Sequence, residues 1–404
     1  GSTLIAILAI SCLNLMGATA VAPITPVLMH HFTLDSAASL GFMGSAFALG
    51  RFCTTSIWPI ASDYVGRRCI LCIAMLGGAL SSTLQGMAIS LNWPFAAFLF
   101  ARGLAGTFSG VVPVLKASIV DTFPADKVPQ ALAYREAAGT FAFVIGPTIG
   151  GALATWNIAL PVYFAASSGV LAALIAAYSI PRGLPSPAKS REGALAGTDQ
   201  VPTSKDSRAS AKAAKEAAPL LLLSFVWAST RTCFHIYYPL MLARKYALPS
   251  VYVGGFMTAV SLLVVLVQLG IFEPTRRRLG LTGTLALGGL LIALGLLGIG
   301  SSGIPLGLFA VFNGLYAVGV ALLSPSMPSL LVRAAPPGRC GLLLGIESAT
   351  VNFARVLAPP VFGLFCLHGG SQASGLATLA ATVLVWRFSR KHRRSPGPGT
   401  AASA

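Results

Sequence analysis

Hydrophobic residues fill long, nearly uninterrupted runs along this chain, and short polar stretches separate one run from the next. A helix of roughly 20 apolar residues crosses the ~30 Å apolar core of a bilayer. In lipid every backbone polar group must be satisfied internally, which a helix achieves within one segment. The pattern therefore predicts twelve membrane-spanning helices, at residues 3–29, 38–61, 69–89, 93–119, 129–155, 158–180, 218–242, 251–271, 281–300, 304–331, 340–367 and 371–387.

Composition agrees with an all-α membrane protein. Hydrophobic residues make up 55% of the 404 positions and charged residues only 10%, whereas a soluble domain carries roughly 25% charged residues. The net charge of +17 could indicate a nucleic-acid-binding protein, but the basic residues lie between the apolar runs. We therefore expect the chain to interact with the lipid bilayer and not with nucleic acid. We also expect it to be a monomer.

Lysine and arginine predict the orientation of the helices. With both termini in the cytoplasm, cytoplasmic segments hold 22 of the 28 basic residues, and the outer loops hold only Arg244 and Lys245. Basic residues accumulate on the cytoplasmic side of membrane proteins. The chain is therefore expected to be an integral multi-pass protein with both termini inside, in a plasma or an organelle membrane.

The helices form two groups of six, at residues 1–180 and 218–389. Between them, residues 181–217 are rich in Pro, Ser, Ala and charge, which predicts a flexible cytoplasmic linker. After them, residues 390–404 begin as a basic tail, which we expect to contact anionic lipid headgroups.

The two groups also read as copies of one another. Five short motifs recur at offsets of 210 to 214 residues, among them "GFMG" at 41–44 with "GFMT" at 255–258, and Glu136 with Glu347. Two six-helix repeats around a cleft at the membrane midplane are the architecture of alternating-access transporters.

Three motifs resemble those of a known family. "PIASDYVGRR" resembles the loop between helices two and three of the major facilitator superfamily, through Asp63, Gly66, Arg67 and Arg68, with Pro59 where a glycine is usual. "RGLAGTFSG", from Arg102, resembles the pattern of the fourth helix. "GPTIGG" resembles the antiporter motif of the fifth helix, through Gly146, Pro147, Gly150 and Gly151.

Among its branches, the sequence is most similar to the twelve-helix drug:proton antiporters, including zinc-induced-facilitator-like members. The resemblance implies two six-helix bundles and a gating role for Asp63 and the two arginines, which would latch the outward-facing state. The alternative for this loop is a topology anchor alone. For the fifth-helix motif, the resemblance implies a bend that closes one side of the cleft, and the alternative is a tight helix contact.

Two acidic residues lie well within predicted spans, Glu136 in helix five and Glu347 in helix eleven. Each is ~10–12 Å deep at 1.5 Å per residue. A carboxylate balanced between desolvation and a nearby cation can exchange a proton, so we expect Glu136, Glu347 or both to bind the coupling proton. The alternative is an ion pair between helices, for which Arg355 is suitably spaced from Glu347. Many relatives carry an acid in helix one, where this chain has Asn14.

Four arginines also fall inside predicted spans, where a charge is costly unless it faces a partner or a wet cavity. With three further polar residues they form the expected substrate cavity: Asn14, Arg51, Arg102, Arg231, His235, Asn313 and Arg355. The net positive interior favours an anionic or zwitterionic substrate. Arg102 could instead be a structural or proton-relay partner, and His235 a satisfied core histidine. No metal site is expected, because Cys69 and Cys72 lack a second ligand pair.

Together these features predict a secondary active transporter of a small organic solute, working by alternating access with proton antiport, in the direction of efflux. The alternatives are a uniporter or proton symporter on the same fold, or a non-transporting membrane sensor. No Walker loop, H-E-x-x-H or Ser/His/Asp set is present, so neither an enzyme nor a cofactor is expected, and a gradient must supply the energy.

Overall fold

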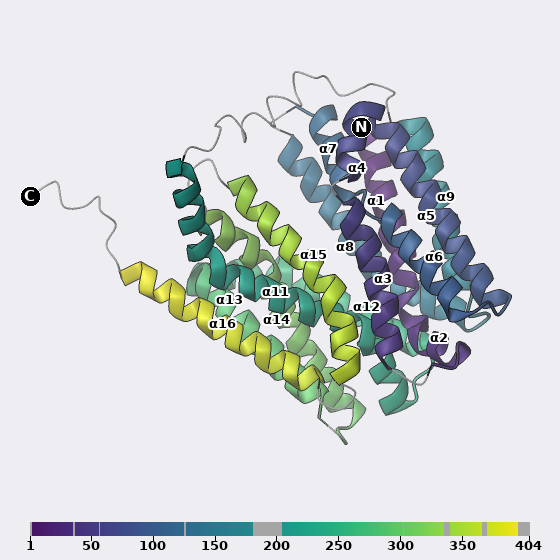
Figure 1. Ribbon diagram of the computed structural model, residues 1–404. Helices are drawn as coiled ribbons and strands as arrows, with labels where there is room; N and C mark the ends of the chain where they lie inside the picture. Colours follow the sequence, from purple (N-terminus) through teal and green to yellow (C-terminus); the bar gives the residue numbers. More distant parts are fainter. Residues whose placement is uncertain are drawn as a thin grey trace, which may run out of the picture. The chain divides into compact units, whose positions relative to one another are not determined.

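The computed structural model describes residues 2–34, 37–55, 57–124, 127–180, 204–301, 303–334, 340–365 and 370–394. Within these ranges every regular element is a helix and none is a strand (Figure 1). The helices belong to two compact units. Unit 1 consists of Gly1–Leu195, Thr232–Leu262 and Arg355–Leu367, and unit 2 of Ala196–Arg231, Leu263–Ala354 and His368–Ala404.

The first six predicted spans form the larger part of unit 1. Their elements are α1 (Ser2–Ala20), η1 (Ala22–Ile24), α2 (Thr25–His31), α3 (Ala37–Thr54), α4 (Ile57–Val65), α5 (Arg67–Ser90), α6 (Phe95–Phe108), α7 (Val112–Thr122), α8 (Val128–Ala154) and α9 (Leu160–Ser179). Three predicted spans are thus interrupted. Prolines stand at the first turns of η1, α2 and α7, where a missing N–H costs least.

Small residues set the spacing of these helices. α1 packs against α8 and α9, α5 against α6 and α9, and α3 against α6. A side chain at Gly106 would collide with the backbone carbonyl of Phe47, so α6 and α3 touch at this point. Glycines allow such close approach between helices in a membrane. The packing keeps several polar side chains of α1, α3, α5 and α6 near one another.

Parts of three later helices complete unit 1. They come from the end of α11 (Ser204–Tyr246), the start of α12 (Ser250–Gly270) and the end of α15 (Cys340–Phe365). Tyr237 Oη donates a 2.7 Å hydrogen bond to the carbonyl of Pro359, and Ser45 Oγ donates a 2.6 Å bond to the carbonyl of Val356. These bonds join α11 and α3 to α15.

Unit 2 holds the remaining parts of these three helices together with α13 (Phe272–Ile299), α14 (Leu306–Ala334) and α16 (Gly370–Arg394). α13 packs against both α14 and α16. Leu223, Leu285 and Leu331 are fully buried in its core. A 3.1 Å hydrogen bond between the hydroxyls of Thr230 and Thr378 joins α11 to α16.

The segment expected to be a flexible linker is partly helical. α11 begins at Ser204 and therefore takes in the last part of residues 181–217. Alanine and lysine dominate this stretch, and both have high helix propensity. Residues 181–203 lie outside the described residues, as do residues 395–404 of the expected tail, whereas residues 390–394 continue α16. The division of the chain at 181–217 stays a prediction.

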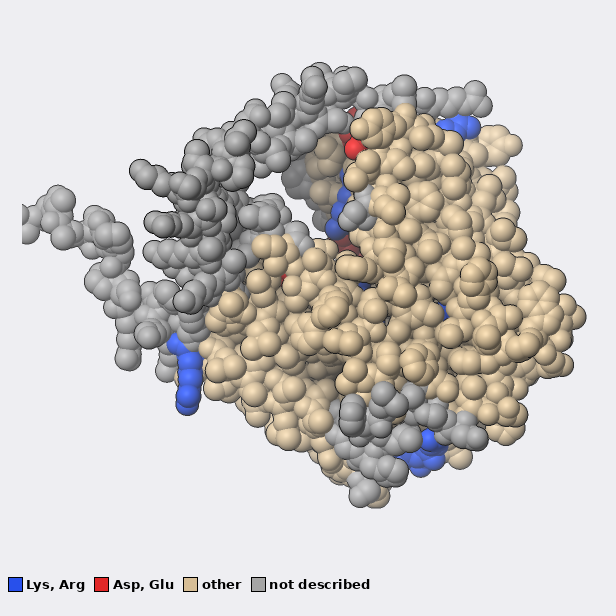
Figure 2. All heavy atoms as spheres, in the orientation of Figure 1, with Lys and Arg blue, Asp and Glu red and all other residues tan. Residues whose placement is uncertain are grey.

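Length and hydropathy support insertion of the helices into a membrane. In the described part of the chain, eight segments are long and apolar enough to cross a bilayer. They are Thr3–His31, Arg67–Ser90, Phe95–Thr122, Gln130–Ala154, Leu160–Ser179, Ser250–Gly270, Phe272–Ile299 and Leu306–Leu331. On the face drawn in Figure 2, the coloured surface is almost entirely uncharged. The chain is an integral multi-pass membrane protein, and the count of twelve spans stays a prediction.

Candidate functional site

A glycine turn separates the two helices that carry the "SDYVGRR" motif. Gly66 ends α4 and precedes α5 with φ 99° and ψ 143°. L-residues with a side chain rarely adopt this backbone conformation, so glycine is required here. The turn places Arg67, the first residue of α5, beside the last turn of α4.

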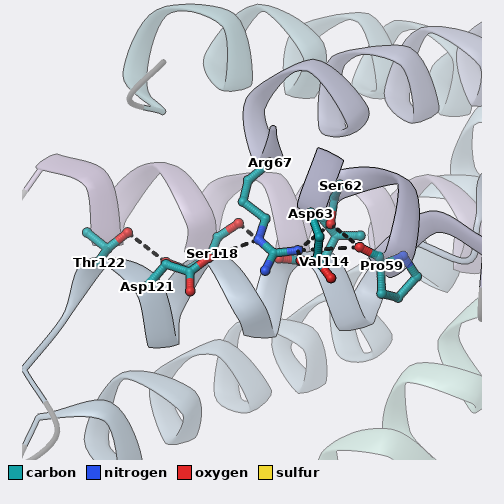
Figure 3. A network of polar contacts seen from close by, with 8 residues as sticks. All are labelled: Pro59, Ser62, Asp63, Arg67, Val114, Ser118, Asp121 and Thr122. Carbon is teal, nitrogen blue, oxygen red and sulfur yellow. Dashed lines mark hydrogen bonds and ion pairs between the residues drawn. The ribbon is translucent and has the colours of Figure 1, made fainter. Parts of the chain in front are cut away.

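Arg67 is the centre of a polar cluster (Figure 3). Its guanidinium lies 2.6 Å from Asp63 Oδ1 and 2.9 Å from Asp121 Oδ2. It also donates to the hydroxyl of Ser62 and, over 3.5 Å, to the carbonyl of Pro59. The side chain of Arg67 is only 11% exposed. One buried cation therefore joins α4, α5 and α7, with most of its hydrogen-bonding capacity satisfied.

Only part of the predicted gating motif belongs to this cluster. Arg68 forms no ion pair with a described residue and is half-buried. The carbonyl of Pro59, which stands at the usual glycine position, accepts from Arg67. In unit 2 the repeated motif shows similar local pairing, since Glu273 contacts Arg276 at 2.6 Å and Arg277 at 2.9 Å. The latch between two conformations stays a prediction.

The fifth-helix motif lies where α8 is packed on two sides. On one side, side chains at Gly146 and Gly150 would collide with Thr19 and with the carbonyl of Ala20 in α1. On the other side, a side chain at Gly151 would come within 2.6 Å of the carbonyl of Ser250, at the start of α12. The tight contact expected of these glycines is present, whereas a role in limiting proton leak stays a prediction.

Polar bonds reinforce the contact of α8 with α12. Thr258 Oγ1 lies 2.6 Å from the hydroxyl of Thr148 and donates a 2.6 Å bond to the carbonyl of Val144. Pro147, inside α8, presents its carbonyl to Gly254 of α12. Because proline has no N–H, Pro147 cannot donate a hydrogen bond to the preceding turn of α8. The Thr258 hydroxyl donates to a carbonyl of that turn, that of Val144.

A cavity of about 260 Å³ lies within unit 1, where α1, α3, α8, α11 and α12 approach one another. We call it the central cavity. Aromatic side chains form much of its wall, and the polar groups among its lining residues include Asn14, Arg51 and His235. None of the described residues that line it is acidic. A mostly apolar pocket with a few polar groups is typical of a small-molecule site.

The charge in the central cavity comes from Arg51. No described carboxylate forms an ion pair with it. His235, exposed to the cavity, lies beside Phe143, with ring centroids 6.4 Å apart. Because the lining holds a cation and no acid, the cavity is better suited to a ligand with a negative group than to a cation.

Arg102 lines a second, smaller cavity of about 130 Å³, which we call the inner cavity. Its guanidinium lies 5.1 Å from the ring centroid of Phe47, and its Nη1 is 3.4 Å from Gln85 Oε1. The Nε atom is buried and has no hydrogen-bond partner among the described residues. Asn14, Phe47 and Ser109 line both cavities. Arg102 lines the inner cavity and not the central one, so its predicted place in the substrate cavity stays a prediction, as does that of Asn14.

Glu136 lies in an ion-pair cluster. Its Oε1 accepts a hydrogen bond from Arg135, which is buried, and lies 3.2 Å from Lys116 Nζ of α7. The carboxylate side chain itself is 61% exposed. The arrangement agrees with an ion pair between helices, although the partner foreseen for such a pair was Arg355, for Glu347. Its role in proton binding stays a prediction.

The other predicted site residues belong to the later helices. Glu347 lies in the part of α15 that belongs to unit 2, where it is half-buried, and Arg355 in the part that belongs to unit 1. Asn313 is buried in α14 of unit 2. Arg231 lies in the unit 2 part of α11. Their shared role in one substrate cavity stays a prediction.

Sequence reasoning missed Asp121, Lys116 and Gln85. Asp121 pairs with Arg67 across 54 positions, and Gln85 meets Arg102 from another helix. A signal was available for Asp121, because it is one of only 11 acidic residues and lies two residues after the predicted span 93–119. No comparable signal marks Gln85.

Within the described residues, no group of three or more His, Cys, Asp or Glu side chains could hold a metal ion. Cys69 is exposed at the start of α5 and Cys72 is half-buried one turn later.

Comparison with known sequences gives a family match. Residues 7–303 match the sequence profile of the Major Facilitator Superfamily. Among curated proteins, Multidrug resistance protein 1 of Bacillus subtilis (strain 168) is 32% identical over 160 residues. That region covers 40% of this chain and 40% of the relative, so the match spans about two fifths of the relative's length.

Comparison with solved structures gives the same fold. A D-xylose-proton symporter is 16% identical, with a TM-score of 0.79 over 96% of this chain and 97% of the symporter. The human organic anion transporter MFSD10 (TETRAN) is 19% identical, with a TM-score of 0.67 over 96% of this chain and 98% of that protein. At these identities the likeness shows the fold.

Proposed function

Because this chain belongs to the Major Facilitator Superfamily and is thus a transporter, we propose that it exports a small organic anion or zwitterion in exchange for protons. The central cavity would hold the substrate. Alternating access in the superfamily fold would open this cavity to one side of the membrane at a time. With both termini in the cytoplasm, as basic residues predict, export would move substrate away from the cytoplasm.

One observation carries the choice of substrate. The central cavity has Arg51 in its wall and no acid among the described lining residues. A guanidinium in a low-dielectric wall attracts a carboxylate, sulfonate or phosphate, and it repels a lipophilic cation. The organic anion transporter with a similar fold agrees with this choice, and the multidrug resistance relative agrees with efflux.

Proton coupling would use Glu136. Its carboxylate pairs with Lys116 and Arg135, and it could release these cations when it is protonated. Such a step would loosen the contact of α7 with α8 on one side of the bundle. In the superfamily's antiporters, a charge change of this kind can bias one of two conformations. Glu347, its counterpart in the sequence repeat, is the second candidate.

Substrate-dependent proton flux in proteoliposomes tests the proposal. Purified protein is reconstituted with a pH-sensitive dye inside, and organic anions, zwitterions and cations are added in turn. We expect one class of anionic or zwitterionic compounds to drive protons in the opposite direction. Glu136→Gln should abolish this proton movement, while Glu216→Gln, in the predicted linker, serves as a matched control.

Each other outcome has a definite meaning. Transport without proton movement would make the protein a facilitator and leave Glu136 structural, as its existing pairing with two cations also allows. Proton movement in the same direction as the substrate would make it a symporter. Flux driven by cations alone would contradict the proposed substrate class.

A further inference from the structure

Arg102 has no carboxylate beside it, unlike the buried arginines Arg67 and Arg135. Arg51 shares this feature, but it lines the central cavity and not the inner one. Arg67 contacts two acids and Arg135 contacts one. Arg102 forms no ion pair with a described residue, and no acid is found among the described residues that line the inner cavity. A buried cation with no counterion is strongly destabilising unless something else compensates its charge.

The hydrogen-bonding groups of Arg102 also lack partners. A guanidinium has five N–H donors in a fixed fork. In Arg102, one nitrogen has a long 3.4 Å contact with Gln85 Oε1, and Nε is buried without a partner. Phe47 covers one face of the group at 5.1 Å, which contributes cation–π attraction and no hydrogen-bond acceptor.

The rest of the inner cavity offers donors. The Asn14 amide and the Ser82 hydroxyl line it, and neither forms a hydrogen bond with a described residue. Ser109 and Ser168 use their hydroxyl protons on nearby carbonyls, at 2.8 Å and 3.0 Å. A volume of about 10–15 Å³ on this measure already holds one water. The cavity of about 130 Å³ therefore has room for a small ion and several waters.

We propose that the inner cavity binds a small monovalent anion against Arg102, with Asn14 and Ser82 as further donors. The site accepts either a free inorganic ion of the size of chloride or the carboxylate of a small organic acid, because both supply one negative charge and several acceptor positions. It is separate from the substrate site of the central cavity, and its occupation does not require transport.

Its position links it to the central cavity. Phe47 lines both cavities and lies over Arg102, and Asn14 also reaches both. An anion bound at Arg102 would hold the Phe47 ring and the Asn14 amide in place. Binding in the inner cavity is therefore expected to change affinity in the central cavity, and the reverse holds by thermodynamic linkage.

Thermal unfolding of the purified full-length protein tests the site directly. The melting temperature is measured in detergent at constant ionic strength while gluconate, a larger and strongly hydrated anion, is replaced by chloride, nitrate, formate or acetate. We expect a saturable rise with small anions. A rise with chloride identifies a free inorganic ion, whereas a rise with formate and acetate but not chloride identifies a carboxylate site.

Two substitutions decide whether Arg102 is responsible. Arg102→Met should abolish the response, and in gluconate it should melt above the natural protein because the unpaired charge is gone. Gln85→Glu places an internal carboxylate beside Arg102. It should also melt higher in gluconate and weaken anion binding roughly ten- to hundredfold. This second variant keeps the test decisive if Arg102→Met fails to fold.

Arg244→Met is the control, because Arg244 is exposed near the end of α11 and lines neither cavity. It should keep the anion response of the natural protein. No response to any small anion would overturn the proposal, as would an anion affinity that is unchanged in Gln85→Glu or a response that is lost in Arg244→Met. None of these readings depends on whether proton antiport is observed, so the proposed function can fail separately.

Discussion

Arg67 and Arg102 are both partly or wholly buried arginines of unit 1, yet their surroundings differ in charge. Arg67 lies between two carboxylates at 2.6 Å and 2.9 Å and also donates to a hydroxyl and a carbonyl. Arg102 has one amide oxygen at 3.4 Å, an aromatic ring and an open cavity. The first guanidinium is neutralised by the protein itself, and the second is not.

The difference separates structural from ligand-binding charges. At Arg67, two carboxylates of the protein compensate the cost of desolvating the guanidinium. Removal of the arginine would leave these two carboxylates without a cation between them. At Arg102 the described residues supply no acid, and the proposed bound anion would compensate its charge. A paired arginine therefore predicts a loss of stability on substitution, and an unpaired one predicts a loss of binding.

The largest effect is expected from breaking the helix contact that holds the inner cavity. In Gly106→Val, the new side chain would collide with the backbone of Phe47, so α3 must move and carry the Phe47 ring away from Arg102. We expect destabilisation of about 3 kcal/mol, at the upper end for overpacking. Thermal unfolding in detergent measures it.

The matched control is Gly103→Ala on the same helix, where the nearest atom to the added carbon is the carbonyl of Ala46 at 3.6 Å. An ordinary contact and the higher helix propensity of alanine predict an unchanged or slightly higher melting temperature. Equal losses in both variants would show that close approach at Gly106 has no special importance.

The next effect is expected at the paired arginine. Arg67→Met leaves Asp63 and Asp121 without their cation, and the two carboxylates are 45% and 28% exposed. We expect a loss of about 2–3 kcal/mol, between the values for exposed and buried ion pairs. The melting temperature measures the loss, with Arg68→Met as the control that should change stability by less than about 0.5 kcal/mol.

Substitution of the two arginines should change the melting temperature in opposite directions. In gluconate, Arg67→Met should lower the melting temperature while Arg102→Met raises it. If both variants lose stability by similar amounts in gluconate, the distinction between a paired and an unpaired arginine is wrong.

The smallest effect on stability is expected at Glu136. Its carboxylate is 61% exposed and Lys116 is 50% exposed, so solvent screens the pair. Glu136→Gln should cost about 1 kcal/mol or less. Unfolding and proton flux are measured on the same preparation. A loss as large as that of Arg67→Met would place Glu136 with the structural charges and remove the reason to assign it to proton coupling.

The long apolar runs predicted most helices to within a few residues. The span expected at 69–89 is α5, Arg67–Ser90, and the span at 158–180 is α9, Leu160–Ser179. The breaks inside the spans at 38–61 and 93–119 were not foreseen, because both halves of each are apolar. The apolar content of a segment indicates whether it lies within the membrane. It does not indicate where a helix is interrupted.

The candidate site was predictable in part. Three of the predicted residues were recognisable because a polar side chain within an apolar run is costly unless it has a partner or lines a wet cavity. They are Arg51, Arg102 and Asn14. Which arginine has a carboxylate partner was not recognisable, since Asp121 reaches Arg67 only through the packing of α7 near α4 and α5. The exposure of Glu136 and its pairing with Lys116 likewise depend on contacts between helices that sequence spacing does not give.

Charge selectivity of transport is the most direct test of the proposed substrate cavity. Its described lining residues include Arg51 and no acid. Proteoliposome uptake is measured for three compounds of the same skeleton: a carboxylate, its neutral amide and the corresponding amine. A substrate site at Arg51 should prefer the carboxylate, and Arg51→Gln should reduce this preference roughly tenfold, which corresponds to the loss of about one charge-assisted hydrogen bond. Preference for the amine, or a carboxylate preference unchanged in Arg51→Gln, would contradict it.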